Sequence, residues 1–241
     1  TERDLETKNA DTLLKRIKLE FQSLVWEKHT FLNHGWDHEV IILDDKIVFR
    51  FPNSSEYGTA LKSEIDLLKF LSDKIQANIP RYKYIAKDYS FAGYDIIPGV
   101  ELSEEVFAKL SDNEKKLIAE QIAKFLTAMH SLTKEELSPF KIDKADMPSE
   151  TKRLRQQSKQ YLEGVLNNNE YRKLTEILDE LDSLDSESIP SVLVHNDMST
   201  SHIFWDSDTR KIGVIDFSDR CLGDPAFDFT GLLDYGDEFF E

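Results

Sequence analysis

The sequence predicts an α+β protein in which a strand-rich N-terminal part precedes a mostly helical C-terminal part. Apolar residues alternate in short runs before residue 102, whereas after Ser111 they recur every three or four positions. The chain has 241 residues and a hydrophobic fraction of 40%, which is enough for one large domain or two lobes. The turn-forming pair Pro98-Gly99 is the expected joint, so we divide the chain into residues 1–97 and 98–241.

The first part alternates between helical and strand-like patterns. Apolar residues at helical spacing predict a helix around residues 13–21. Residues 39–52 are typical of two strands joined by a turn at Asp44-Asp45. Residues 56–75 carry a helical apolar stripe, and residues 83–102 resemble two more strands. Helix, hairpin, helix and hairpin therefore follow one another in this part.

The second part begins with a strong helix signal. Ser111 and Glu114 have the spacing of a capping box, and a long amphipathic pattern follows them. Helical patterns return over residues 148–167 and 170–184. Between residues 189 and 217 the period changes back to that of strands. We expect the short strands to lie within the helical part.

Charge and cysteine content narrow the possible partners and the compartment. The chain has 46 acidic and 30 basic residues and a formal charge of −16, which disfavours nucleic acid and favours a cationic small molecule. The single cysteine, Cys221, allows no internal disulfide and fits the cytosol. We find no membrane span and no signal peptide, and we expect a monomer that binds neither membranes nor nucleic acid.

Acids and imidazoles gather between Val194 and Asp219, in "VHNDMSTSHIFWDSDTRKIGVIDFSD". Asp197 follows an apolar run, so it should lie just beyond a strand end. If the last strand continues through Asp216, alternation places this acid on an apolar face, where it needs a cation or a metal. Magnesium is usually held by one or two carboxylates plus substrate phosphates, and Asp216 fits that role.

These motifs resemble those of a known enzyme family. "HNDMSTSH" is similar to the kinase catalytic loop H-x-D-x-x-x-x-N, and "IDFS" is similar to the metal-binding D-F-G. With the following "LGDPAFDF", their spacing most resembles the aminoglycoside phosphotransferase family, and within it the 2″-phosphotransferases. The resemblance implies a two-lobed protein-kinase-like fold with an antiparallel-sheet N-lobe and a mainly helical C-lobe. It also implies transfer of phosphate from ATP or GTP, with Mg²⁺, to a hydroxyl group.

The resemblance assigns roles to the C-terminal motifs. Asp197 would be the catalytic base that accepts the proton of the attacking hydroxyl. Asp216 would bind Mg²⁺ next to the nucleotide phosphates, and His202 would be a metal ligand or a group behind the ligands. Ser218 replaces the usual glycine of D-F-G. His195 would brace the loop, as a buried histidine more often does.

The nucleotide is expected to contact the N-terminal lobe. Glu64 lies on the inner stripe of its predicted helix and needs a partner, and Arg50 occupies a strand position. The two resemble the kinase Lys–Glu pair that positions phosphates, with arginine in place of lysine; an ordinary salt bridge is the alternative. Gly35 lies where a loop covering the nucleotide belongs. The main chain of Asp95 and Ile97 matches the hinge that contacts the purine.

Acidic residues near the C-terminus match positions that hold the amino groups of aminoglycosides. The predicted substrate-binding residues are Ser199, Asp219, Asp234 and Asp237. Closely spaced carboxylates suit cationic amines, but a solvated acidic tail is the alternative. We expect Asp224 and Asp228 to tie the catalytic loop and to cap a helix.

Several other functions fit parts of the pattern. Within the kinases, the acceptor could be choline, methylthioribose or fructosamine. A nucleotide-binding module without activity would not need both Asp197 and Asp216. A metallohydrolase built on His195, Asp197, His202 and Asp216 would need a further upstream ligand cluster. The family usually continues past the position of Glu241, which leaves open whether this chain is truncated.

Overall fold

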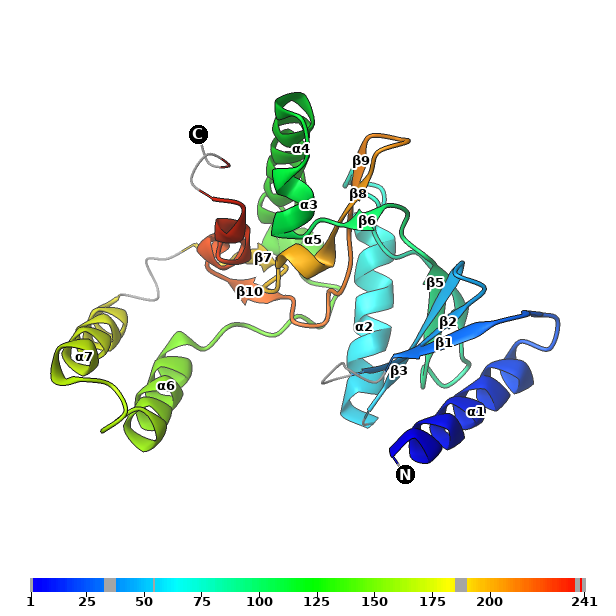
Figure 1. Cartoon of the computed structure of the whole chain (residues 1–241), viewed down its shortest axis with the longest axis horizontal. Coiled ribbons are helices and arrows are strands. Elements are labelled where there is room, and N and C mark those ends of the chain that lie inside the picture. Colours follow the sequence, from blue (N-terminus) through cyan, green and yellow to red (C-terminus); the bar gives the residue numbers. More distant parts are fainter. Residues whose placement is uncertain (1, 33–37, 54, 185–189, 237–238, 240–241) are drawn as a thin grey trace.

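The computed structural model describes residues 2–32, 38–53, 55–184, 190–236 and 239. A five-stranded sheet with two long helices forms the N-terminal part, and helices with short strands form the rest (Figure 1). The α+β class with an antiparallel N-terminal sheet and a mainly helical C-terminal part is confirmed. No helix in the described residues is long and apolar enough to cross a lipid bilayer.

The N-terminal sheet is antiparallel and has the strand order β1-β2-β3-β5-β4. The predicted hairpin is present, and both Asp44 and Asp45 have positive φ, at 50° and 53°. Two such residues form the tight turn that matches the twist of paired strands. The strands are β1 His29–Leu32, β2 His38–Leu43, β3 Ile47–Pro52, β4 Tyr82–Ile85 and β5 Ala92–Asp95.

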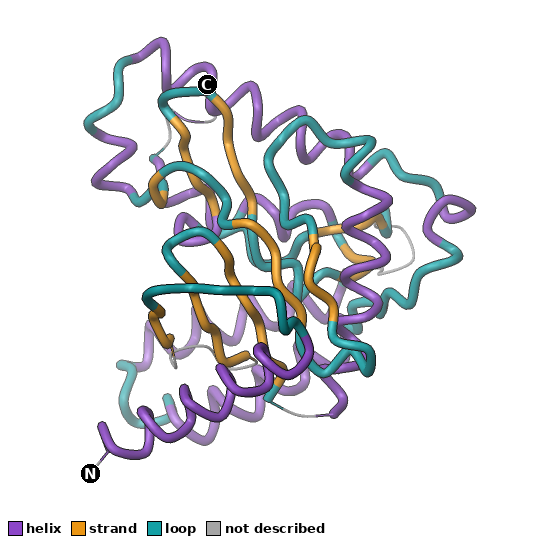
Figure 2. Tube along the Cα trace, turned by 90° about the vertical axis from the view of Figure 1, so that its right-hand side faces the viewer, coloured by secondary structure: helices purple, strands orange, loops and turns teal. Residues whose placement is uncertain are grey.

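Two helices complete the N-terminal part, α1 Glu2–Glu20 and α2 Ser55–Leu71. Leu13 and Ile17 of α1 are buried in an apolar cluster with residues of β2 and β3, as the helical spacing predicts. The apolar stripe of α2 is buried as well, but the helix ends at Leu71 rather than at residue 75. Figure 2 shows both helices beside the strands of this sheet.

The C-terminal part is built on helix α4 Asp112–His130. The capping box of Ser111 and Glu114 is present in both directions. The apolar face of α4 is buried against β7 and β9, in the largest core cluster of the described residues. The other helices are α3 Glu104–Ala108, α5 Lys134–Leu137, α6 Met147–Tyr161 and α7 Asn168–Ser183. Helices α6 and α7 pack against each other at one end of the molecule (Figure 1).

Short strands lie between these helices and flank the loop that follows Val194. They form a two-stranded sheet, β10-β7, and a three-stranded sheet, β6-β8-β9. The expected joint at Gly99 has φ 110°, and a Cβ there would lie 2.5 Å from the backbone of Trp205, so only glycine fits. The strands are β6 Val100–Glu101, β7 Val192–Val194, β8 Ile203–Asp206, β9 Lys211–Val214 and β10 Cys221–Gly223; the 3₁₀ helices are η1 Thr200–His202, η2 Pro225–Phe229 and η3 Gly231–Tyr235.

Candidate active site

The loop after β7 is held by a buried carboxylate. Asp228, on η2, accepts hydrogen bonds from the backbone N–H groups of His195 at 3.1 Å and Asn196 at 2.8 Å. Its Oδ2 also lies 2.8 Å from Nε2 of His130 at the end of α4. Asn196 has φ 67°, a conformation that L-residues adopt rarely and that these bonds help to stabilise. Asp228 therefore ties the loop, as the sequence suggested, while the link to His130 had no sequence signal.

The buried side chain of His195 contacts the backbone of the loop. Its ring is fully buried, with Nε2 3.0 Å from the carbonyl oxygen of Ile215, and the backbone N–H of Asp197 donates to Nδ1 at 3.3 Å. Burial lowers the pKa of His195, which favours the neutral ring that these two contacts require. The geometry fits a bracing role.

The Asp197 side chain is accessible to solvent. Its side chain is 41% exposed, and Oδ2 lies 3.3 Å from Nδ1 of His202. The same nitrogen lies 2.9 Å from the carbonyl oxygen of Asp197 and 3.2 Å from the hydroxyl of Ser199. The short helix η1 brings His202 back over the loop. Asp197 is thus oriented while one face of its carboxylate stays open.

The reasoning from strand alternation is wrong for Asp216. Strand β9 ends at Val214, and Asp216 has φ 60°. A residue in the left-handed region cannot continue a strand, so the alternation stops before Asp216. The turn directs the carboxylate toward the catalytic loop, where Oδ2 lies 3.9 Å from Nε2 of His202.

Arg50 joins the N-terminal sheet to this loop. Its Nη1 donates to Oε1 of Glu64 at 2.8 Å, and its Nη2 donates to Oδ1 of Asp216 at 2.9 Å. The predicted Arg–Glu pair is therefore present, with side chains only 5% and 2% exposed. Three more partners surround the guanidinium: Tyr82 at 3.1 Å, the Ser218 hydroxyl at 2.7 Å and Nδ1 of His38 at 3.3 Å.

This network sets the charge of the groups in it. Burial alone would lower the pKa of Arg50, but Glu64 and the other partners raise it well above its ordinary value. Burial alone would raise the pKa of Asp216, but Arg50, with a hydrogen bond from Ser218, lowers it to about 2. Both side chains are therefore ionised at neutral pH, as binding of phosphate and of a metal cation requires.

The expected hinge lies at the end of β5. Asp95 is paired with Ile47 of β3 and forms an ion pair with Lys83. The next residue, Ile96, donates its N–H to the carbonyl oxygen of Lys46 at 2.7 Å. Ile97 is buried in an apolar cluster that also holds Val48 and Tyr94, with Phe204 and Ile215 packed against it. The cluster brings both parts of the chain together beside the hinge.

The expected substrate residues that the structure describes lie on three segments: Ser199 directly before η1, Asp219 between β9 and β10, and Asp234 on η3. Ser199 precedes η1, and Gly231 of η3 packs against it so closely that a Cβ would lie 2.9 Å from the Ser199 Cα. Asp219 is exposed, and its carbonyl oxygen accepts from the side chain of Asn196 at 3.1 Å. Gly35 and Asp237 lie outside the described residues.

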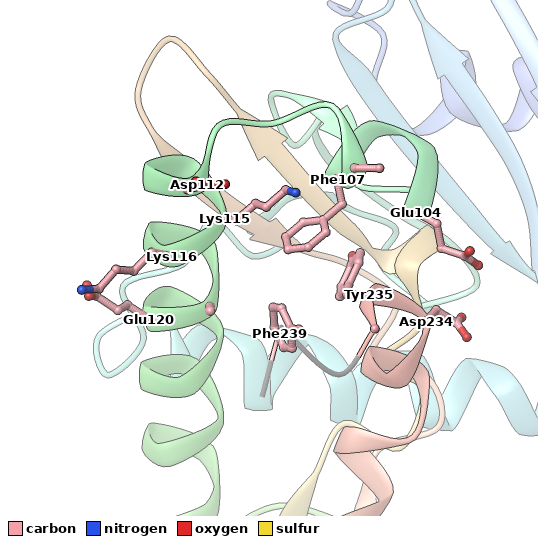
Figure 3. A pocket seen from close by; sticks show the side chains of 12 residues that line it. Glu104, Phe107, Asp112, Lys115, Lys116, Glu120, Asp234, Tyr235 and Phe239 are labelled. Carbon is pink, nitrogen blue, oxygen red and sulfur yellow. The ribbon is translucent and has the colours of Figure 1, made fainter. Parts of the chain in front are cut away.

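Asp234 lines a cavity of about 800 Å³ between α3, α4 and η3. Figure 3 shows the carboxylates of Glu104 and Asp234 on the same side of this cavity, beside the rings of Phe107 and Tyr235. The ring centroids lie 4.5 Å apart, and the Tyr235 hydroxyl donates to the carbonyl oxygen of Leu102 at 2.7 Å. Asp234 is therefore an exposed acid on a firmly packed element, but it is not in contact with Asp197.

The residues around Asp216 can be compared with what a Mg²⁺ site requires. Oδ2 of Asp216 lies 3.9 Å from Nε2 of His202, and Oδ1 is engaged by Arg50 and Ser218. One carboxylate oxygen is thus left for a cation, which suits Mg²⁺ because it takes few protein ligands. In the part of the chain that the structure describes, no cluster of three or more His, Cys, Asp or Glu could hold a metal by itself. The residues therefore fit an ion that is shared with a phosphate ligand.

Sequence comparison identifies the family. The profile of the phosphotransferase enzyme family, APH, matches residues 28–241. The chain belongs to this family. The match covers both the Arg50–Glu64 pair and the loop from His195 to Asp219, and it confirms that the chain is a phosphotransferase.

Solved structures of family members are similar to this phosphotransferase along most of its length. A GDP and kanamycin complex of APH(2″)-IIIa is 27% identical, with a TM-score of 0.85, over 95% of this chain and 80% of that chain. An ADP-bound APH(2″)-Ib is 25% identical, with a TM-score of 0.71 and coverage of 95% and 78%. A streptomycin–ATP–APH(2″)-IIa ternary complex has 25% identity, a TM-score of 0.70 and the same coverage. These likenesses confirm the kinase-like fold.

Proposed function

We propose that this phosphotransferase transfers the γ-phosphate of ATP or GTP to a hydroxyl group of a cationic, aminoglycoside-like substrate. The observation that carries the proposal is the convergence of four side chains from distant segments. Asp197 lies 3.3 Å from His202, His202 lies 3.9 Å from Asp216, and Asp216 lies 2.9 Å from Arg50. The proposed base, the proposed metal ligands and the proposed phosphate-binding cation thus form one continuous chain of contacts.

Asp197 would act as the catalytic base. A hydroxyl group becomes a better nucleophile as its proton moves to a nearby carboxylate, and such a base typically contributes about 10²- to 10⁴-fold. The Asp197 carboxylate is oriented by His202 and remains 41% exposed. It can therefore meet an acceptor that enters from solvent.

Asp216 and His202 would hold Mg²⁺. When bound, the ion neutralises charge on the phosphates. Within the chain, Asp216 stays ionised because Arg50 keeps its pKa low. His202 is oriented by the carbonyl of Asp197 and by Ser199, which leaves Nε2 directed toward Asp216.

The nucleotide would lie between the sheet and the catalytic loop. Arg50, fixed by Glu64, would contact the phosphates, since a guanidinium binds phosphate oxygens well. The backbone of Asp95 and Ile97 would contact the purine edge beside the apolar cluster around Tyr94. Gly35 would lie in the loop that covers the nucleotide, a role that rests on the sequence alone. Complexes of the related enzymes with GDP, ADP and ATP support a purine nucleotide as donor.

The acceptor would be held by carboxylates around the catalytic loop. Ser199, Asp219, Asp234 and Asp237 are the proposed contacts, and the formal charge of −16 favours the approach of polyamines. Solved structures of related enzymes contain kanamycin, streptomycin and gentamicin. We expect the enzyme to act as a monomer.

Mass spectrometry of reaction mixtures tests the proposal. The protein would be incubated with ATP or GTP, Mg²⁺ and either kanamycin, gentamicin and streptomycin or choline, methylthioribose and fructosamine. A mass gain of one phosphate on an aminoglycoside, absent with Asp197→Asn, is the expected result. Phosphorylation of another polyol alone would refute the acceptor class but not the kinase chemistry. Nucleotide binding without transfer to any acceptor would favour a binding module, and hydrolysis without nucleotide would favour a metallohydrolase.

A further inference from the structure

We propose that Ser218 is a positioning residue, which acts with Arg50 to orient the Asp216 carboxylate for Mg²⁺-dependent nucleotide binding. The inference rests on the proposed function. It concerns the residue that replaces the glycine of D-F-G and that has no assigned part in the reaction.

The Ser218 hydroxyl makes two directed hydrogen bonds. It donates to Oδ1 of Asp216 at 2.9 Å and accepts from Nη2 of Arg50 at 2.7 Å. A hydroxyl has one proton and two acceptor sites, so both bonds form together. The three side chains close a small ring, in which Arg50 also donates directly to Oδ1 at 2.9 Å.

The two carboxylate oxygens of Asp216 have different surroundings. Oδ1 is held by two donors, whereas Oδ2 is turned toward Nε2 of His202 at 3.9 Å. The hydrogen bonds of Oδ1 therefore determine where Oδ2 points. Partners behind a metal-binding carboxylate commonly change metal affinity 10- to 100-fold when they are removed.

The ring also explains why arginine and serine occur together here. The terminal nitrogens of Arg50 have four N–H groups; Glu64 and Tyr82 lie beside Nη1, and Asp216, Ser218 and His38 lie beside Nη2. A lysine would have fewer donors to satisfy, and a glycine at position 218 would offer no acceptor. The two departures from the usual Lys and D-F-G pattern thus contact each other directly.

Calorimetry with the non-hydrolysable β,γ-imido analogues of ATP and GTP tests the proposal. Binding would be measured with and without Mg²⁺ for the wild-type protein, Ser218→Ala, Ser218→Thr and the control Ser131→Ala. The Ser131 hydroxyl bonds to a backbone carbonyl at the end of α4, in an exposed position. Circular dichroism would establish that each variant is folded.

We expect Ser218→Ala to lose about tenfold or more of the affinity that Mg²⁺ adds, with little change in the Mg²⁺-free affinity. Ser218→Thr, which keeps the hydroxyl, should retain most of the affinity that Mg²⁺ adds. Ser131→Ala should behave as the wild type. Equal losses with and without Mg²⁺, or no loss, would overturn the inference while the proposed function stands. If the wild-type protein binds neither analogue, the proposed function fails and this inference fails with it.

A double-mutant cycle adds a second readout. Arg50→Lys and Ser218→Gly would be measured alone and together, in the same titrations. Because the two side chains share a hydrogen bond, the combined loss should be smaller than the product of the single losses. Independent effects would show that Ser218 does not act through Arg50 and would overturn the inference.

Discussion

Nη1 of Arg50 and Oε1 of Glu64 lie 2.8 Å apart, and both side chains are almost completely buried. Strand β3 supplies one and helix α2 supplies the other, so the pair fixes the helix against the sheet. Because Nη2 of the same guanidinium reaches Asp216, the pair also links the sheet to the catalytic loop. Under the proposed function, fold stability and nucleotide binding would therefore both depend on this one buried group.

Removing Glu64 should destabilise the protein strongly. Glu64→Ala leaves Arg50 buried without its nearest carboxylate, and breaking a buried pair costs about 3–5 kcal/mol. We expect about 3 kcal/mol, near the lower limit, because Asp216 remains as a second partner. Urea unfolding followed by circular dichroism measures the change. Lys62→Ala, which removes an exposed pair on the same helix, is the control and should have little effect; a similar loss in both variants would argue against the buried pair.

Arg50→Ala should weaken nucleotide binding or turnover at least tenfold. The loss of one phosphate contact at this level corresponds to about 1.4 kcal/mol. Steady-state kinetics with varied nucleotide measure it. Arg16→Ala is a matched control, since Arg16 lies over the rings of Phe51 and Phe91 in the same part of the chain and donates to Ser90. An unchanged KM for nucleotide with an unchanged kcat would leave Arg50 a structural residue.

Asp197 and Asp216 should respond differently to amide substitution. Asp197→Asn should lower kcat by about 10²-fold or more and leave nucleotide affinity almost unchanged, because the base contacts the acceptor. Asp216→Asn should impair Mg²⁺-dependent nucleotide binding as well as turnover, because a metal-binding carboxylate is lost. Calorimetry and kinetics on both variants, with the exposed Asp208→Asn as control, separate the two roles. Loss of nucleotide binding in Asp197→Asn and its retention in Asp216→Asn would reverse them.

Asp234→Asn should raise the KM for an aminoglycoside about tenfold, as expected for a lost hydrogen bond to a charged amine. The KM for nucleotide should stay constant, because Asp234 lies on η3, away from Arg50. Asp112→Asn changes an acid on another wall of the same cavity and serves as the control. Equal changes in the two variants would point to general electrostatic attraction rather than to a specific contact.

The Asp216 carboxylate should make the stability depend on acid pH. Its pKa falls from the ordinary 3.8 to about 2 in the folded protein, so its stabilising contribution is complete above pH 3.8. The contribution is lost as the pH falls from about 4 to about 2. Its size should be on the order of 1 kcal/mol, since the side chain is 39% exposed and solvent screens the pair. Unfolding of wild type and Asp216→Asn across this range should show a shallower pH dependence in the variant; parallel curves would contradict the prediction.

Local sequence signals were enough to predict those turns and helix ends that depend only on neighbouring residues. The turn at Asp44-Asp45 and the capping box of Ser111 and Glu114 form between residues at most three positions apart. Their side chains and dihedral preferences determine the local backbone directly. The order of the acids and histidines after Val194 likewise indicated the kind of chemistry, because the catalytic loop and the metal-binding acid are close in the chain.

The tertiary structure decided how these residues are used. Strand periodicity carried no sign that Asp216 would leave the strand with φ 60°, and nothing near Arg50 in the chain indicated Ser218, 168 positions away, as its partner. The same holds for the bond between His130 and Asp228, which spans 98 positions. The free energy of a buried charge depends on every donor and acceptor around it, and packing brings those groups together from segments whose local patterns are independent.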